Sequence, residues 1–245
     1  MGELTHKAAR AAFGKAIDLT LKHVEKDREN GLLQLVDLTE KFMGNNFPAE
    51  SYVGARNLIR DPESKWMQYV NRALDEIHPN VIKQTALNLG FEAAFHGTKT
   101  IRAMRETHQC NIPWLILMDP TSACNLHCTG CWAAEYGNKL NLSYEELASV
   151  VRQGRELGVY FYMMTGGEPM VRKKDIIELC RKHNDCVFFA YTNGTLVDEA
   201  LCKQMQEVGN LFLGLSVEGE PDVNDMRRGN GVYLSLIHIS EPTRH

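Results

Sequence analysis

The sequence predicts an α/β protein in which a helical N-terminal region precedes a parallel sheet of alternating strands and helices. From residue 1 to about residue 110, apolar residues recur at helical spacing and the alternation typical of strands is missing. After Ile112, short runs that are apolar throughout alternate with amphipathic segments, a pattern typical of strands buried on both faces. We therefore expect two regions, 1–110 and 111–233.

In the first region, one helix is expected to present an apolar face made of Trp66, Val70, Ala73, Leu74 and Ile77. The stretch "HPN" at residues 78–80 should end it, because proline is poorly tolerated inside a helix. A second helix is expected through "VIKQTALNLGFEAAF".

In the second region, the expected strands are "WLILM", "VYFYMM", "VFFAY" and "LFLGLSV". The helix after the first strand is well marked, because Ser143 and Glu146 fit a capping box and Leu142 and Leu147 a hydrophobic staple, while Gly158 ends it. The helix before the fourth strand has an apolar stripe at Leu201, Met205 and Val208 and a stop at Gly209.

Composition excludes several classes of function. The chain has 245 residues, a formal net charge of −4 and interspersed charges, so no basic face is expected to bind nucleic acid. No apolar run approaches the roughly 18 residues of a transmembrane segment, and no secretory signal is evident. The expected location is therefore the cytoplasm, where seven cysteines point to metal binding or chemistry more than to disulfides.

Three cysteines, Cys124, Cys128 and Cys131, follow the first predicted strand at C-x3-C-x2-C spacing. Soft thiolates favour an iron–sulfur cluster or zinc. A closed structural site normally has four ligands, so three leave a metal coordinatively open. The alternative is a zinc site that takes Cys110 or a histidine as its fourth ligand.

Four motifs stand in order at the ends of the four predicted strands: "CNLHCTGC", "TGGEP", "YTNGT" and "LSVEG". Barrel enzymes assemble their sites at this face. From about Ile112 to Tyr233 the chain resembles the radical SAM superfamily. The resemblance implies a truncated parallel (β/α) partial TIM barrel with about four of the usual six strands.

By this resemblance, Cys124, Cys128 and Cys131 hold a 4Fe-4S cluster whose open iron binds S-adenosyl-L-methionine (SAM). Reductive cleavage of SAM gives a 5′-deoxyadenosyl radical that abstracts a substrate hydrogen. The implied cofactor-binding residues are Gly166, Gly167, Glu168, Pro169, Asn193, Ser216, Glu218 and Arg228.

The implied roles differ among these residues. The glycines allow close approach to the methionyl group, Glu168 accepts from its ammonium, and Pro169 stiffens the turn. Ser216 and Glu218 bind the ribose, with Asn193 as a weaker contact. Arg228, or Arg227 in its place, pairs with the methionyl carboxylate.

One position departs from the family pattern. The family usually carries an aromatic residue before the third cysteine, and here that residue is Gly130. Trp132 is either a substitute adenine contact or a core residue. His127 is expected to be a solvated neighbour of the cluster rather than a ligand.

The expected function is that of an oxygen-sensitive radical SAM enzyme in peptide maturation or haem-like cofactor tailoring. Its expected partners are an electron donor such as a flavodoxin or ferredoxin and a peptide or small-molecule substrate. Two alternatives stay open: a non-catalytic metal-binding or interaction protein, and a molybdenum-cofactor-type cyclase. The cyclase is less favoured because its cysteine triplet usually lies near the N-terminus.

The last residues break the pattern of the second region. The stretch "LSLIHISEPTR" from Leu234 to Arg244 matches one reading-frame translation of a widely used sequencing-library adapter. We expect residues 234–245 to be an adapter-derived artefact and the natural protein to continue differently after about Tyr233. The last predicted strand would then be an apolar, aggregation-prone edge.

Overall fold

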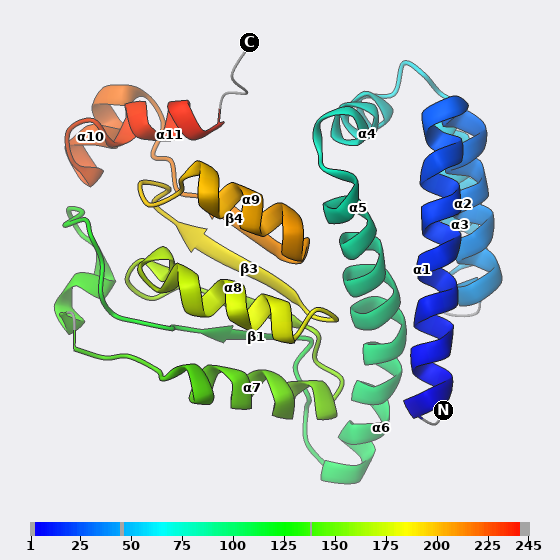
Figure 1. The fold of residues 1–245 in the computed structure, drawn as a ribbon, viewed down its shortest axis with the longest axis horizontal. Coiled ribbons are helices and arrows are strands. Elements are labelled where there is room, and N and C mark those ends of the chain that lie inside the picture. Colours follow the sequence, from blue (N-terminus) through cyan, green and yellow to red (C-terminus); the bar gives the residue numbers. More distant parts are fainter. Residues whose placement is uncertain (1–2, 45–46, 138, 241–245) are drawn as a thin grey trace.

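A computed structural model describes residues 3–44, 47–137 and 139–240. The N-terminal region is helical, as predicted. Its helices are α1 (Glu3–Lys26), α2 (Arg28–Met43), α3 (Ala49–Ile59), α4 (Lys65–Glu76), α5 (Pro79–Thr85), the π-helical η2 (Ala86–Gly97) and α6 (Thr98–His108). Helices α1 to α3 lie side by side, and α5, η2 and α6 form one rod between them and the sheet (Figure 1).

The predicted apolar face of α4 is correct only in part. Val70 and Leu74 pack against a small core around Val24 and Leu32, and Met67 is buried there too. Trp66, expected on this face, is 69% exposed. The buried stripe runs through positions 67, 70 and 74, and each step of one residue turns a helix by about 100°.

Ile77, also expected on that face, lies beyond the end of α4 and is exposed. The chain turns there, as predicted from the proline, and α5 begins at Pro79.

The four predicted strands form one parallel sheet in the order β1-β2-β3-β4. They are β1 (Leu115–Met118), β2 (Phe161–Met164), β3 (Val187–Thr192) and β4 (Leu211–Leu215). The α/β fold with a helical region before a parallel sheet is therefore confirmed. No described helix is long and apolar enough to span a membrane.

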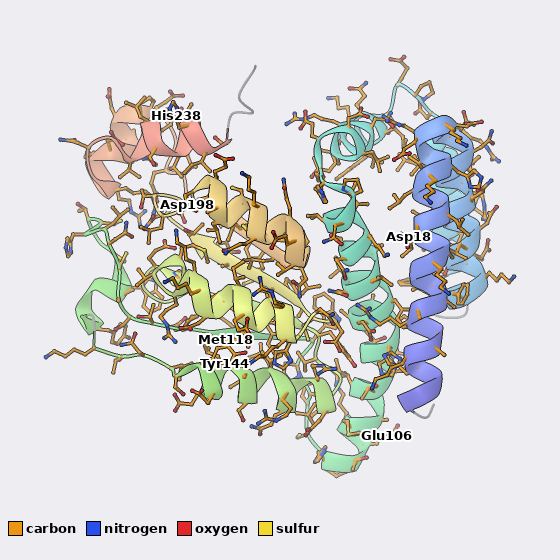
Figure 2. The ribbon with its side chains drawn as sticks, viewed as in Figure 1. Asp18, Glu106, Met118, Tyr144, Asp198 and His238 are labelled. Carbon is orange, nitrogen blue, oxygen red and sulfur yellow. The ribbon has the colours of Figure 1, made fainter. Side chains whose placement is uncertain are left out.

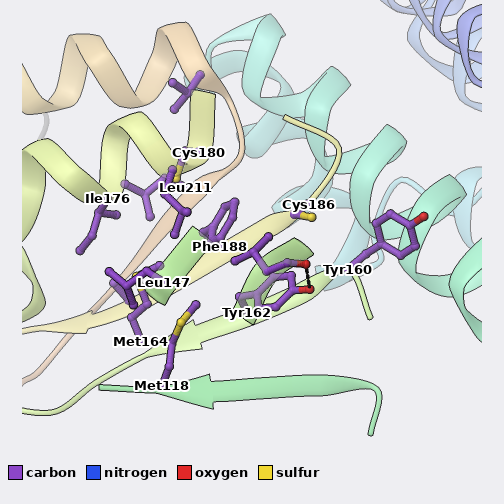
Figure 3. Packing of buried hydrophobic residues seen from close by; sticks show 14 of the residues in the cluster. Met118, Leu147, Tyr160, Tyr162, Met164, Ile176, Cys180, Cys186, Phe188 and Leu211 are labelled. Carbon is purple, nitrogen blue, oxygen red and sulfur yellow. Dashed lines mark hydrogen bonds between the residues drawn. The ribbon is translucent and has the colours of Figure 1, made fainter. Parts of the chain in front are cut away.

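One face of the sheet is covered by α7 (Tyr144–Glu156), α8 (Lys173–Lys182) and α9 (Glu199–Val208). Between them lies the main core, in which Tyr162, Phe188 and Leu147 have no exposed surface (Figure 3). The capping box of α7 is present: Glu146 N donates to Ser143 Oγ at 3.2 Å, and Ser143 N donates to the Glu146 carboxylate at 2.7 Å. Asp198 (Figure 2) caps α9 by accepting a hydrogen bond from Leu201 N at 2.7 Å, and Gly209 ends this helix.

The rod of α5, η2 and α6 packs at the N-terminal ends of the strands. Asn88, which is fully buried, donates from Nδ2 to Asn184 O at 2.9 Å and to Cys186 O at 3.0 Å. Asn80 likewise donates to the carbonyls of Gln206 and Glu207. The strands point away from this rod (Figure 1), so their carboxyl ends lie on the far side from the N-terminal helices.

Beyond β4, the chain forms α10 (Pro221–Arg228) and α11 (Val232–Ser240). The structure shows a helix from Leu234 up to Ser240, within the stretch expected to be derived from an adapter. Leu236 of α11 is 2% exposed, whereas Leu234 is 72% exposed. Residues 241–245 of the expected artefact lie outside the described residues.

Candidate cluster and cofactor site

The loop that carries the three cysteines leaves β1 and is held against the "GGEP" turn after β2. Gly167 N donates to Thr121 O at 2.9 Å, and Glu168 N donates to Ala123 O at 2.8 Å. A Cβ on Gly167 would lie 2.3 Å from Ala123 O, closer than a real side chain allows. Gly166 adopts a φ of +104°, and a Cβ added there would lie 2.6 Å from Thr121 O. The two glycines therefore let the backbones of the two loops touch.

The three predicted cluster ligands come together. Cys124, Cys128 and Cys131 are free and partly buried, and they line one cavity of about 160 Å³ together with Gly167. Cys124 Sγ accepts a hydrogen bond from Leu126 N at 3.4 Å. Burial raises the pKa of the Cys124 thiol, and this backbone donor acts in the opposite direction.

The donor set fits an iron–sulfur cluster, because three thiols face one cavity and thiolates are the ligands such clusters take. Cys110, the alternative fourth ligand, is exposed and does not line this cavity, whereas His127 does. Within the described ranges, no three His, Cys, Asp or Glu side chains form a group that could hold one metal ion.

The remaining cysteines lie elsewhere. Cys180 and Cys186 are buried in the main core, and burial raises the pKa of both thiols. Cys202 is exposed on α9. These three cysteines therefore occupy packing or surface positions away from the triplet.

Glu168, whose backbone N donates to Ala123 O, is 1% exposed. Its Oε1 accepts from Met170 N at 2.9 Å and from Thr192 Oγ1 at 2.7 Å, and its Oε2 accepts from Asn193 N at 2.7 Å. The carboxylate therefore joins the ends of β2 and β3. A carboxylate has about four acceptor positions, so one remains for a further donor.

The neighbouring predicted residues take structural positions at the same edge. Pro169 is buried and opens a short 3-10 helix, η4 (Pro169–Arg172), in keeping with a rigid turn. Asn193 is 6% exposed, and its amide bonds to Asn125 of the cysteine loop and to Thr195.

Glu218 and Arg228, predicted to bind different ends of SAM, are paired with each other. Arg228 Nη2 donates to Glu218 Oε1, and Arg227 Nη1 donates to Glu218 Oε2 at 2.9 Å. The Arg228 guanidinium, with Arg227, holds the pKa of the Glu218 carboxyl below its ordinary value. Ser216 N donates to Thr192 O at 3.0 Å, which places this residue beside the end of β3.

The α10 helix that carries these arginines also reaches the cysteine loop, because Thr129 N donates to Arg227 O at 2.8 Å. Gly130, where an aromatic residue was expected, adopts a φ of +71°. Trp132 is 58% exposed and makes an edge contact with Tyr136 at 5.9 Å between ring centroids, so it is not a core residue.

A second, larger cavity adjoins the one lined by the cysteines. Its volume is about 730 Å³, its walls include Trp132, Tyr136 and Leu140, and it shares Ser122 with the cysteine cavity.

Sequence reasoning missed the residues that hold the loops together. They are Thr121, Asn125, Thr192 and Thr195. Three of the four lie inside the motifs "CNLHCTGC" and "YTNGT". The motifs therefore mark these residues, but they do not indicate that the side chains bond to each other.

Residues 118–235 match the family model described as "Radical SAM superfamily". The chain is 34% identical over 121 residues to the Fe-coproporphyrin III synthase of Methanosarcina barkeri, a match that covers 47% of this chain and 30% of that protein. It is 34% identical over 131 residues to the cysteine-type anaerobic sulfatase-maturating enzyme of Clostridium perfringens, covering 46% of this chain and 35% of that protein. The chain thus spans about a third of the length of these relatives.

Among solved structures, SuiB of Streptococcus suis bound to S-adenosylmethionine matches with a TM-score of 0.46 and 18% identity, over 67% of this chain and 38% of that one. The family match covers all four motif loops, and the structure gathers these loops at one edge of the sheet. Residues 118–235, which hold the cysteine triplet and the ordered motifs, therefore match the radical SAM superfamily.

Proposed function

We propose that this chain carries the cluster and cofactor site of a radical SAM enzyme, with Cys124, Cys128 and Cys131 as ligands of a 4Fe-4S cluster. The observation that carries the proposal is the cavity that these three free thiols line together with Gly167 of the "GGEP" turn. When bound, the cluster and SAM supply an electron and a 5′-deoxyadenosyl radical that abstracts a substrate hydrogen. Three protein thiolates leave one iron of such a cluster free for another ligand.

The chain's own residues bind and orient SAM at the same edge of the sheet. Glu168 has one acceptor position left for the methionyl ammonium. Arg228 and Glu218 would exchange their mutual ion pair for the methionyl carboxylate and the ribose hydroxyls, respectively. Ser216, at the end of β4, would join Glu218 on the ribose.

The names of two relatives support a proposal for the substrate class. One relative is named as a coproporphyrin synthase and another as a sulfatase-maturating enzyme, which acts on a protein. We infer that the whole protein acts on a peptide or on a haem-like molecule, in the cytoplasm, with a flavodoxin or ferredoxin as electron donor. The larger cavity beside the cysteines, with Trp132 and Tyr136 in its wall, offers apolar surface to either substrate.

The test is reductive cleavage of SAM by anaerobically reconstituted protein with its natural C-terminus. Wild-type protein should bind iron and release 5′-deoxyadenosine. Cys128→Ala should lose both, whereas Cys202→Ala, which removes an exposed cysteine outside the cavity, should retain both. Iron binding and product release that survive in Cys128→Ala would contradict the proposal, as would tight zinc binding without iron in the wild type.

The natural C-terminus matters because we propose that residues 234–245 come from an adapter sequence. Sequencing of the source locus should diverge from "LSLIHISEPTR" after about Tyr233. A locus that encodes this stretch would refute the proposal and make α11 a native element.

A further inference from the structure

A closed ring of hydrogen bonds joins the cysteine loop to the loop after β3. Asn193 Nδ2 donates to Asn125 Oδ1 at 2.9 Å, and Asn125 Nδ2 donates to Thr195 Oγ1 at 2.8 Å. The Thr195 hydroxyl donates in turn to Asn193 Oδ1 at 2.7 Å. Within the ring, each of the three side chains thus donates one hydrogen bond and accepts one.

The ring rests on a fixed base. Asn193 is 6% exposed, and its backbone N donates to the buried Glu168 carboxylate at 2.7 Å. Thr195 N donates to Asn193 Oδ1 at 3.0 Å, which fixes the two members from the β3 loop relative to each other. Asn125 is exposed, so burial does not hold it in place. The ring itself holds Asn125 to the end of the sheet.

The position of Asn125 in the cysteine loop gives the ring its importance. The loop is anchored before Cys124 by the "GGEP" turn and after Cys128 by the bond from Thr129 N to Arg227 O. Between these two anchors lies the segment from Cys124 to Cys128. In the part of the chain that the structure describes, the hydrogen bonds from this segment to residues outside the cysteine loop are those of Asn125. This contact therefore holds the chain between two of the three cysteines, Cys124 and Cys128.

We infer that Asn125, Asn193 and Thr195 are positioning residues that fix the spacing of Cys124 and Cys128 before a cluster binds. The inference rests on the proposed function of these cysteines as cluster ligands. Groups held in place before binding lose less conformational entropy when the ligand arrives. Opening the ring should loosen the loop in the cluster-free protein and shorten the lifetime of the bound cluster.

Thr195 offers a clean test, because it lies outside the cysteine loop and outside the predicted SAM contacts. Thr195→Val keeps the shape of the side chain and removes the hydroxyl, so two of the three ring bonds are lost. Thr195→Ser keeps the hydroxyl and is the matched control. Asn125→Ala, at an exposed position, is a second variant, and a urea titration of each variant checks that the fold is retained.

The first measurement is amide hydrogen exchange of peptides that cover residues 123–131 in cluster-free protein. Thr195→Val and Asn125→Ala should exchange at least about fivefold faster than wild type, because fivefold corresponds to one net hydrogen bond and each variant loses two. Thr195→Ser should exchange at the wild-type rate. Wild-type exchange in both Thr195→Val and Asn125→Ala would overturn the inference, and so would equally fast exchange in the serine control.

The second measurement is the rate at which reconstituted protein loses iron to a chelator under anaerobic conditions. Thr195→Val should lose iron faster than wild type and Thr195→Ser should not. Equal rates in all three would also overturn the inference. If wild-type protein binds no iron, the proposed function fails, while hydrogen exchange still decides whether the ring holds the loop.

Discussion

The two ends of the parallel sheet both contain buried polar side chains, but these side chains hold different things together. At the N-terminal end, Asn88 and Glu92 of η2 and Arg10 of α1 tie two helices to the sheet: Arg10 Nη2 donates to Asn88 Oδ1 at 2.6 Å, and Arg10 Nε lies 2.7 Å from Glu92 Oε1. At the carboxyl end, Glu168 and Asn193 tie loops to one another and leave three thiols facing a cavity.

The two ends of this sheet therefore have different roles: one contributes to the stability of the fold and the other to the cysteine site. Polar groups at the N-terminal end join preformed helices to the sheet, so their loss should lower stability and leave the cysteines in place. Polar groups at the carboxyl end order loops that have little apolar packing of their own. Their loss should affect the cysteine site more than the free energy of unfolding.

The largest effect is expected at the contact between the "GGEP" turn and the cysteine loop. In Gly167→Ala, the new Cβ would lie 2.3 Å from Ala123 O, so the two loops must move apart. We expect loss of iron binding after reconstitution and a free energy of unfolding lower by about 1–3 kcal/mol. Gly54→Ala in α3 is the control, since no atom lies within 4 Å of its added Cβ. Retained iron binding in Gly167→Ala would show that the close contact is dispensable.

The next effect concerns the N-terminal end of the sheet. Asn88→Ala removes three hydrogen bonds and leaves Arg10 and two backbone carbonyls without this partner. The free energy of unfolding, measured in urea, should fall by about 1–3 kcal/mol, with iron binding retained at permissive temperature. Arg72→Ala, which removes an exposed pair with Glu76, should cost less than about 0.5 kcal/mol. Loss of iron binding in folded Asn88→Ala would contradict the conclusion that polar groups at the N-terminal end of the sheet affect stability and not the cysteine site.

A pH dependence sharpens the account of the N-terminal end. Burial raises the pKa of Glu92 from 4.5 to about 7 despite the nearby Arg10, and burial lowers the pKa of His96 from 6.5 to about 4. Folded Glu92 binds its proton more tightly than unfolded Glu92, so its contribution to stability falls as pH rises from 4.5 to about 7. Folded His96 binds its proton less tightly, so its contribution falls as pH drops from 6.5 to about 4.

In the wild type, the contribution of Glu92 to the free energy of unfolding falls and that of His96 rises as pH increases from 4.5 to 6.5. Glu92→Gln removes the contribution that falls with pH. The free energy of unfolding of this variant should therefore rise with pH through this window more steeply than that of wild type. Urea titrations of the cluster-free protein across the window measure the difference. Parallel curves for the two proteins would show that Glu92 does not titrate as its burial requires.

The smallest effect lies in the helical layer between the two ends. Ser143→Ala removes the capping side chain of α7 and should lower the free energy of unfolding by about 1 kcal/mol, with no change in iron binding. Ser149→Ala, inside the same helix, is a useful reference because the Ser149 hydroxyl accepts hydrogen bonds from Arg152 and Gln153, which are side chains of that helix and not its free backbone N–H groups. A larger loss at Ser149 than at Ser143 would contradict the capping role.

The sequence predicted the layers of this fold well because apolar periodicity and caps are local signals. The four strands, the capping box at Ser143 and the stop at Gly209 all followed from residues close together in the chain. The exposure of Trp66 was missed because two apolar stripes one residue apart cannot be told apart without the partner helix.

The candidate site was predictable down to its cysteines but not to its hydrogen bonds. The triplet and the "GGEP" turn were expected to meet because the carboxyl ends of parallel strands share one edge. The pairing of Glu218 with Arg228 and the ring through Asn125 depend on which loops lie side by side, and no local pattern encodes that. Similar polar residues in a motif can bind a cofactor or bind each other.

The most direct test of the central claim is the electron paramagnetic resonance spectrum of the reconstituted, reduced protein with its natural C-terminus, recorded with and without SAM. We predict the signal of a reduced 4Fe-4S cluster that shifts when SAM is added and is absent in Cys128→Ala. A cluster signal that SAM leaves unchanged, or one that persists in Cys128→Ala, would contradict an open cluster site at Cys124, Cys128 and Cys131.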